Sequence, residues 1–473
     1  MLFNSLEFFI FFIVVYSTYL LFSHGGQNRL LLVASYIFYG WWDWRFLSLL
    51  LLSTIVDYVC AIKIEDAPTS QVRKKFLLLS ICFNLSLLGF FKYFNFFISS
   101  FEALLANLGI AFHPWTLKII LPVGISFYTF QTMSYVIDIY RRDLKPARNF
   151  LDFALYVSYF PQLVAGPIER AAHLLPQVLR PRRVTLEQFY QGCYLLFWGL
   201  FQKVVIADNL AKVVDPIFAS PPPYDGLMVL LATYAFAFQI FCDFAGYSDM
   251  ARGLGKMMGF DIMVNFNLPY FATNAREFWQ RWHISLSTWL RDYLYISLGG
   301  NRQGEKATYR NLMITMLLGG LWHGANWTFV VWGAFHGLLL IIHRAIEPSL
   351  KKLRLSSNII LENIFWGVRV IFFFHLVCLG WLFFRAPNLS QALDMLTSVL
   401  TAFHWPTFQN LLDAGLFFIL ALLLVQILQY RQKNLLFIFE YPAWIRGTFY
   451  FVIWVLILTF GVTGGKAFIY FQF

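Results

Sequence analysis

The chain has 473 residues, of which 59% are hydrophobic, 20% aromatic and only 13% charged. An ordinary soluble domain carries about 25% charged residues, so this composition excludes a soluble globular protein and indicates a membrane protein. The formal net charge of +11 would suit nucleic acid, but the sequence has no polar domain that could present a basic binding face. We therefore expect contact with membrane lipids and no nucleic-acid partner.

Apolar runs recur along the chain and predict helices that cross a bilayer. They cover residues 6–22, 30–60, 76–98, 117–140, 189–214, 227–249, 311–343, 364–384, 413–429 and 446–464. Since one crossing needs about 20 residues and the longest runs can cross twice or re-enter, we predict about ten to twelve spans. Hydrocarbon offers no water to backbone groups, so the fold class is expected to be all-α and polytopic. No linker interrupts the pattern, and residues 1–473 are expected to form a single domain.

The first run is expected to be a retained helix rather than a cleaved signal, because it has no basic start and Glu7 precedes its core. The cysteines are five in number and mostly lie in apolar runs. They are Cys60, Cys82, Cys193, Cys242 and Cys378. This pattern predicts small buried side chains, with neither a disulfide framework nor a metal site.

Basic residues cluster between the apolar runs. The clusters are Arg73-Lys74-Lys75, Arg141-Arg142-Lys145-Arg148, Arg180-Arg182-Arg183, Lys351-Lys352-Arg354 and Arg431-Lys433. In short loops such clusters mark the cytoplasmic side of the membrane and contact anionic lipid. The same arginines would also suffice to hold an anionic substrate from the cytosol.

Polar residues also concentrate in the middle of the chain. Asp243 and Asp249 end an apolar run, where a membrane helix tolerates an acid only if it faces a partner or a water-filled cavity. On a helix over 278–302, one polar stripe would comprise Arg281, Ser285, Thr288 and Asp292. His283 and Ser287 would share a further face. This segment is interpreted either as an interfacial helix or as a re-entrant helix that lines a site.

The stretch GGLWHGANW, residues 319–327, places His323 inside a long apolar run. Gly320 and Gly324 have the spacing that lets another backbone approach, or that leaves room for a ligand. On a helix, Asn326 would lie on nearly the same face as His323. A neutral imidazole in such a low-dielectric place is suited to act as a general base, because burial disfavours the imidazolium. The alternative is a structural histidine bonded to a neighbouring helix.

His336 lies further along the same run. On a continuous helix it would stand about 19 Å from His323 along the axis and on the opposite side. Unless the helix breaks, we expect it at a different level of the bundle. The motifs H-x-x-x-x-D, H-E-x-x-H, G-x-S-x-G and the P-loop are absent from the sequence, which argues against the enzyme classes that depend on them.

Several long motifs resemble those of the membrane-bound O-acyltransferase (MBOAT) family. The family likeness lies in RWHISLSTWLRDYLYISLGGNR at 281–302 and LGGLWHGANWTFVVWGAFHG at 318–337. Further motifs resemble the bacterial alginate O-acetyltransferase branch, which takes in peptidoglycan O-acetyltransferases and, more distantly, the teichoic acid D-alanyl transferase. They are SYIFYGWWDWRF at 35–46, LPVGISFYTFQTMSYVIDIYR at 121–141, FPQLVAGPIER at 160–170, DFAGYSDMA at 243–251 and the terminal FIYFQF.

The resemblance implies a helical bundle around a central tunnel, with His323 of the W-H-G motif as the catalytic residue. The second histidine noted in the family corresponds to either His283 or His336. The supporting or tunnel-lining candidates are Trp322, Asn326, His283, Arg281, Ser287, Asp292, His336 and Asp249. Arg291 and Arg302 are the candidates for holding the acyl donor.

The resemblance further implies acetyl-CoA as the donor substrate, with no permanently bound cofactor, at the bacterial inner membrane. The final acceptor would be an extracytoplasmic polysaccharide, alginate-like or peptidoglycan, reached through a periplasmic SGNH-type partner transferase. A thioester is already activated, so the protein must only align it, remove one proton and exclude water. His323 can do this in one step as a base or in two as an acetyl-imidazole carrier.

Three alternatives from other classes stay open. The first is a transporter or flippase for an envelope precursor, which polar residues at membrane depth would also suit. The second is an MBOAT protein that uses another acyl donor, such as a D-alanyl carrier protein. The third is an assembly scaffold for a periplasmic enzyme.

Overall fold

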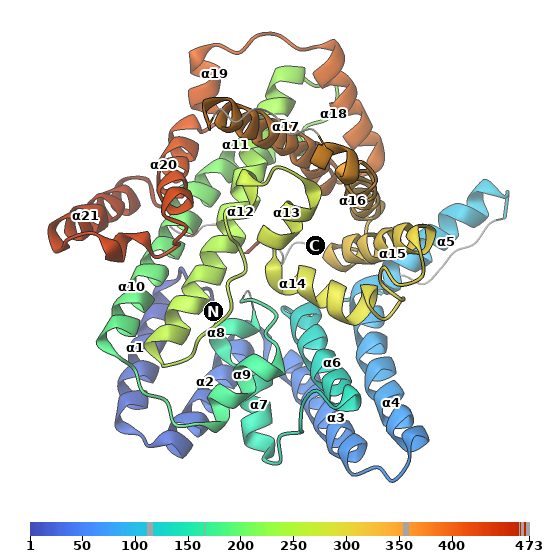
Figure 1. Cartoon of the computed structure of the whole chain (residues 1–473), viewed down its shortest axis with the longest axis vertical. Helices are drawn as coiled ribbons and strands as arrows, with labels where there is room; N and C mark the ends of the chain where they lie inside the picture. Colours follow the sequence, from blue (N-terminus) through green and yellow to red (C-terminus); the bar gives the residue numbers. More distant parts are fainter. Residues whose placement is uncertain (111–116, 165, 353–358, 463, 465–467, 470–473) are drawn as a thin grey trace. The chain divides into compact units, whose positions relative to one another are not determined.

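The computed structural model describes residues 1–110, 117–164, 166–352, 359–462, 464 and 468–469 (Figure 1). In this part of the chain every regular element is helical, which confirms the predicted all-α class. Arg354, the side chains of Lys351 and Lys352 and residues 470–473 of the terminal motif lie outside the description. The chain divides into unit 1, Met1–Tyr194 with Ala251–Met263, and unit 2, Leu195–Met250 with Val264–Phe473. The single domain stays a prediction.

Unit 1 is built from the first half of the chain. Its helices are α1 (Leu6–Leu21), α2 (His24–Asp43), η1 (Trp44–Phe46), α3 (Leu47–Glu65), α4 (Ser70–Leu88), η2 (Gly89–Tyr93), α5 (Phe94–Asn107), α6 (Ile125–Arg141), α7 (Phe150–Ser158), α8 (Phe160–Leu163), α9 (Ala171–Leu179) and the start of α10 (Leu186–Phe201). Helices α3, α4 and α6 pack together, and α7 packs on α2 and α9.

Unit 2 holds the rest of the elements. They are η3 (Gln202–Ala207), α11 (Asp208–Ala219), α12 (Gly226–Met257, whose end belongs to unit 1), η4 (Pro269–Phe271), α13 (Ala275–Arg281), α14 (Ile284–Trp289), η5 (Leu290–Tyr295), α15 (Glu305–His323), α16 (Trp327–Lys352), α17 (Ile359–Arg385), α18 (Leu389–Thr401), α19 (Phe408–Asp413), α20 (Leu416–Gln432), η6 (Phe437–Glu440) and α21 (Ala443–Phe460). Helix α16 packs against α13, α15 and α17.

Several helices have the length and apolar composition of membrane spans. Among the described residues, six stretches qualify: His24–Glu65, Ser70–Asn107, Gly226–Met257, Trp327–Ser349, Ile360–Arg385 and Ala443–Phe460. Two shorter apolar helices are Leu6–Leu21 and Leu416–Gln432. These stretches support a polytopic membrane protein, and the expected ten to twelve spans stay a prediction.

The apolar run that carries His323 is not one helix. Helix α15 ends at His323, Gly324 has an extended backbone, and α16 begins at Trp327. The two helices pack side by side (Figure 1), and Gly320 meets Gly333 so closely that a Cβ on Gly320 would lie 3.1 Å from the Cα of Gly333. The prediction of a distant level for His336 depended on a continuous helix, and the break is the exception that it allowed. Gly320 admits a neighbouring backbone, as one of the two interpretations proposed, whereas a Cβ on Gly324 would meet the ring of Phe329.

The amphipathic segment 278–302 is broken as well. Helix α13 ends at Arg281, and His283 has a φ of 43°, in the left-handed region, before α14 begins at Ile284. Because this residue interrupts the helical repeat, the predicted stripe from Arg281 to Asp292 does not form on a single helix. The turn instead changes the direction of the chain at a histidine.

Two of the basic clusters of unit 1 lie at one end of its helices. Arg73, at the start of α4, donates to the carbonyls of Ile139 and Tyr140 at the end of α6. Arg148 pairs with Asp66 at 3.2 Å, so the turns after α3 and α6 lie together. A shared basic end is what a cytoplasmic face requires.

Two sequence predictions need correction in unit 1. Arg182 is not available to hold a substrate, because its guanidinium donates to Tyr19 and Asn28 and lies 4.5 Å from the ring centroid of Phe260. Among the five cysteines, which are all free, Cys82 is exposed and Cys193 half-buried. The prediction of small buried thiols therefore holds only for the rest.

Candidate active site

Three buried histidines of unit 2 lie in one group of aromatic rings. His323 ends α15, His283 precedes α14 and His336 lies within α16, and each is at most 3% exposed. The ring centroids of His283 and His323 are 6.4 Å apart. Trp332 contacts both His323, at 5.0 Å, and His336, at 4.8 Å. We call these three residues the histidine cluster.

The ring of His323 is enclosed by aromatic side chains. Trp322, Trp332 and Phe384 lie 5.2, 5.0 and 5.4 Å from it, centroid to centroid, and each is nearly perpendicular to it. Edge-to-face packing of this kind fixes the plane of the imidazole. The ring therefore lies in surroundings of low polarity, formed by aromatic carbon atoms.

His283 is held by an asparagine from a distant part of the chain. Its Nδ1 lies 3.2 Å from the side-chain oxygen of Asn265. The same oxygen accepts from the backbone N–H and the hydroxyl of Ser285 at 3.2 and 2.9 Å, while the amide nitrogen donates to Ser248. The backbone carbonyl of Asn265 also accepts from Ile284. These bonds hold the turn around His283 in its left-handed conformation.

The bonds to Asn265 also determine the proton arrangement on His283. The backbone N–H of Ser285 can only donate, so the atom of Asn265 that faces it is the oxygen. An amide oxygen can only accept, so Nδ1 of His283 carries the proton. In the neutral ring, Nε2 is therefore the nitrogen with the lone pair.

Asn326 lies elsewhere than predicted. Because α15 ends at His323, no helical face relates the two residues. The side-chain oxygen of Asn326 accepts from the N–H of Thr328 in the first turn of α16, and its amide donates to the carbonyl of Pro387. Its bonds are those of a helix cap.

The other predicted supporting residues are spread over local contacts. Arg281 pairs with Glu277 at 2.9 Å, and the hydroxyl of Ser287 donates to the carbonyl of Trp282. Arg291 pairs with Asp292 at 2.7 Å. The structure does not bring these residues together with His323.

The remaining polar candidates lie apart from one another. Arg302, like Arg291, has an exposed side chain, so both remain accessible for a donor. Asp249, on α12, accepts from Gln202 at 3.1 Å. Among the candidates in the described part of the chain, Trp322 and His283 contact the ring of His323, and His336 is linked to it through Trp332.

Sequence reasoning missed Asn265, Trp332 and Phe384. Asn265 lies in an irregular segment and reaches His283 only through the tertiary fold, so no local spacing reveals it. Trp332 and Phe384 look like ordinary apolar residues of α16 and α17. Their contacts depend on the break at Gly324, for which the signal was a glycine followed by a capping asparagine.

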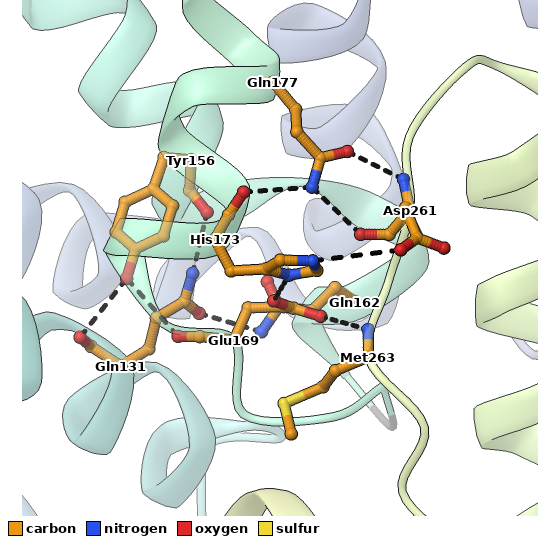
Figure 2. Close-up of polar contacts among 8 residues, drawn as sticks. All are labelled: Gln131, Tyr156, Gln162, Glu169, His173, Gln177, Asp261 and Met263. Carbon is orange, nitrogen blue, oxygen red and sulfur yellow. Dashed lines mark hydrogen bonds and ion pairs between the residues drawn. The ribbon is translucent and has the colours of Figure 1, made fainter.

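A second polar group lies in unit 1, on the motif at 160–170 (Figure 2). Glu169 is fully buried, accepts from the backbone N–H of Met263 at 2.6 Å, and lies 2.8 Å from Nδ1 of His173. Gln177 exchanges two hydrogen bonds with the backbone of Asp261. These contacts tie α9 to residues 261–263. We call Glu169, His173, Gln177 and Asp261 the α9 clamp.

The α9 clamp also explains the electrostatics of its histidine. The hydrogen bond to Glu169 raises the pKa of His173 above its ordinary value of 6.5, against the opposing effect of burial, and the charges of Glu169 and Asp261 add to the rise. The ring is 42% exposed, so solvent weakens these charge effects.

Comparison with known proteins identifies the family of the chain. The model of the "MBOAT, membrane-bound O-acyltransferase family" matches residues 141–384, more than half of the 473 residues. The "Probable alginate O-acetylase AlgI" of Azotobacter vinelandii is 46% identical over 383 residues, 80% of this chain and 74% of that protein. The "Peptidoglycan O-acetyltransferase" of Helicobacter pylori is 38% identical over 397 residues, which are 77% of this chain and 72% of that protein.

A more distant relative is the "Teichoic acid D-alanyltransferase" of Streptococcus thermophilus, 30% identical over 236 residues, 47% of this chain and 57% of that protein. The chain belongs to the membrane-bound O-acyltransferase family. It is a multi-pass membrane enzyme, an O-acyltransferase, as the sequence motifs predicted.

Proposed function

We propose that the protein moves an acetyl group from cytosolic acetyl-CoA across the bacterial inner membrane, for O-acetylation of an extracytoplasmic polysaccharide. The relatives named for alginate and peptidoglycan O-acetylation support this substrate class. The observation that carries the mechanism is the enclosure of His323 by Trp322, Trp332 and Phe384. Such an imidazole accepts a proton readily and is shielded from water, which would otherwise hydrolyse the thioester.

His323 acts as the general base in this proposal. It takes the proton from the acceptor hydroxyl while the hydroxyl oxygen attacks the thioester carbonyl. The carbon–sulfur bond then breaks, the new ester bond remains, and the proton passes to the departing CoA thiolate. His283, oriented by Asn265, presents Nε2 as a second acceptor beside His323. The neutral ring pair avoids the repulsion of two buried imidazolium ions.

The charge distribution supports the direction of transfer in this proposal. The turns that hold Arg73 and Arg148 form a basic end of unit 1, which favours the cytoplasmic side for these turns. Arg291 and Arg302 are the ligands of the CoA phosphates in this proposal. A periplasmic SGNH-type transferase is the partner that would carry the acetyl group on to sugar hydroxyls. No permanently bound cofactor takes part.

The test uses the full chain in lipid nanodiscs with radiolabelled acetyl-CoA. We expect release of free CoA that falls about 10²- to 10⁴-fold in His323→Ala, the usual contribution of a general base. His375→Ala is the matched control, because this histidine is exposed, bonds to the carbonyl of Ile371 and lies outside the histidine cluster. Full turnover in His323→Ala would show that His323 has no catalytic role.

Further arms of the same assay separate the alternatives. Turnover with a D-alanyl carrier protein but not with acetyl-CoA would show that the carrier protein is the donor. Movement of a labelled envelope precursor without loss of an acyl group would indicate a transporter. Acid quenching during turnover distinguishes the two chemical routes, because only the two-step route leaves label on the His323 ring.

A further inference from the structure

Asp243 carries a charge within α12, in a stretch that qualifies as a membrane span, and the proposed reaction does not use it. Its Oδ1 lies 2.7 Å from Nζ of Lys203, and Lys203 lies equally close, 2.7 Å, to Oδ1 of Asp208. None of these side chains is more than 4% exposed. We call Lys203, Asp208 and Asp243 the lysine triad.

The backbone geometry of unit 2 creates the lysine triad. Gly199 and Gly246 pack against each other, and a Cβ on either would collide with the carbonyl oxygen of the other. This close crossing of α10 and α12 brings Lys203 to Asp243. Lys203 is the second residue of η3, a π-helix, and π-helical turns are frequent at functional sites.

The second oxygen of Asp243 holds a different part of the chain. It accepts from the backbone N–H of Ile469 at 2.7 Å. Phe460 and Val462, which precede Ile469 in the chain, bond to α11 and η3. The N–H of Val462 donates to the carbonyl of Val204 at 3.0 Å, and Asn209 donates to the carbonyl of Phe460 at 2.8 Å.

The residue before Ile469 packs behind the histidine cluster. Phe468 is fully buried, with its ring 5.2 Å from Phe244 and 4.9 Å from Tyr247. Phe244 in turn packs edge-to-face on His283, at 4.7 Å between ring centroids. Phe244 therefore contacts Phe468 and His283 at once.

We infer that Asp243 is a positioning residue for acyl transfer. Its carboxylate anchors the N–H of Ile469, so that Phe468 supports Phe244 and Phe244 fixes the plane of His283. Lys203 compensates the buried charge of Asp243, and Asp208 completes the pairing of Lys203. The consequence for transfer rests on the proposed function, whereas the anchoring of residues 468–469 does not.

Two matched variants test the inference: Asp243→Ala and Asp208→Ala. Each removes one carboxylate from Lys203 and changes the charge of the triad equally, but only Asp243 holds Ile469. Hydrogen exchange of peptides that contain Ile469 is measured in nanodiscs, beside the kinetics with acetyl-CoA. In Asp243→Ala we expect exchange to rise and kcat to fall about tenfold, the effect of one charge-assisted hydrogen bond. The KM for acetyl-CoA should stay within about twofold.

In Asp208→Ala, the hydrogen exchange of the Ile469 peptides and kcat should both stay near the values of the unchanged protein. Asp243→Asn keeps a side-chain oxygen that can accept from Ile469, so it should restore slow exchange. Phe468→Ala leaves the triad whole and should lower kcat alone, which keeps the test valid if Asp243→Ala does not fold.

Equal effects of the two alanine variants on exchange would overturn the inference, as would unchanged exchange in Asp243→Ala or unchanged kcat in Phe468→Ala. If the unchanged protein released no CoA, the proposed function would fail, while the exchange measurement would still decide whether Asp243 anchors the segment.

Discussion

The histidines of the two units are held in opposite ways. In unit 2, the histidine cluster is enclosed by aromatic rings, and His283 bonds to the neutral amide of Asn265. In unit 1, His173 lies partly in water and faces two carboxylates, Glu169 and Asp261. The first environment favours a neutral ring and the second a charged one. The same residue type therefore takes part in an ionic attachment in unit 1 and, in the proposed function, in proton acceptance in unit 2.

The comparison teaches that burial alone does not identify a reactive histidine. His336 is as deeply buried as His283, yet neither of its ring nitrogens has a hydrogen-bond partner within the described residues. Its ring stacks on Phe278 at 5.8 Å and contacts Trp279 and Trp332. These contacts indicate a packing role behind Trp332. His283 differs because Asn265 fixes its proton.

The largest effect in this comparison is expected from the asparagine. Asn265→Leu leaves His283 without its partner and the N–H of Ser285 without its acceptor. We expect acetyl transfer to fall about a hundredfold, since misplacing a catalytic group by about 1 Å has that effect. Asn267→Leu is the matched control, because Asn267 is an exposed residue of the same segment. Equal losses in both variants would show that the rate falls because the segment is disturbed, and not because the side-chain hydrogen bonds of Asn265 are lost.

A smaller effect should separate packing from chemistry at His336. His336→Ala removes the ring behind Trp332 and should lower the transfer rate about tenfold, with a loss of stability near 3 kcal/mol. His336→Phe keeps the stacked ring and should stay close to the unchanged rate. Kinetics and thermal unfolding in nanodiscs give both quantities. A large loss of rate in the phenylalanine variant would show that the ring nitrogens of His336 take part in the reaction. His336 would then share the role proposed for His283.

The smallest effect concerns pH and the α9 clamp. Because the folded pKa of His173 is raised, its pairing stabilises the fold below the unfolded pKa of about 6.5. This contribution is lost as pH rises through the folded pKa. His173→Gln should therefore destabilise the protein more at pH 6 than at pH 9, by no more than about 1 kcal/mol because the ring is partly exposed.

Thermal unfolding at both pH values measures the difference. Besides Glu169 and Asp261, Lys256 belongs to the same charge group, at 3.6 Å from Asp261. His24→Gln is the control, because that ring bonds to the carbonyl of Val178. A pH-independent effect at His173 would show that its charge plays no part in the clamp.

Much of the fold could be predicted because the length and periodicity of apolar runs depend directly on whether a segment faces lipid, protein or water. The helical class and the position of His323 at a special point of an apolar run follow from that. The breaks at Gly324 and His283 could not be predicted with the same ease. A glycine in an apolar run is compatible with helix, and the left-handed turn at His283 is held by Asn265, a tertiary partner.

The candidate site shows the same division. Trp322 is next to His323 in sequence and contacts it, so local reasoning found it. Asn326 was assigned to the wrong role because the helix was assumed to continue past His323. Arg281 and Asp292 were placed on one stripe for the same reason, although different partners hold them.

The lysine triad imposes an order on biogenesis. During synthesis, Lys203 and Asp208 leave the ribosome first and can neutralise each other within one short stretch. Asp243 follows alone inside α12, and an isolated acid in hydrocarbon is unfavourable by a few kcal/mol. Helix α12 can therefore enter lipid at low cost only while the stretch around Lys203 is still beside it. The insertion machinery must release these two segments together.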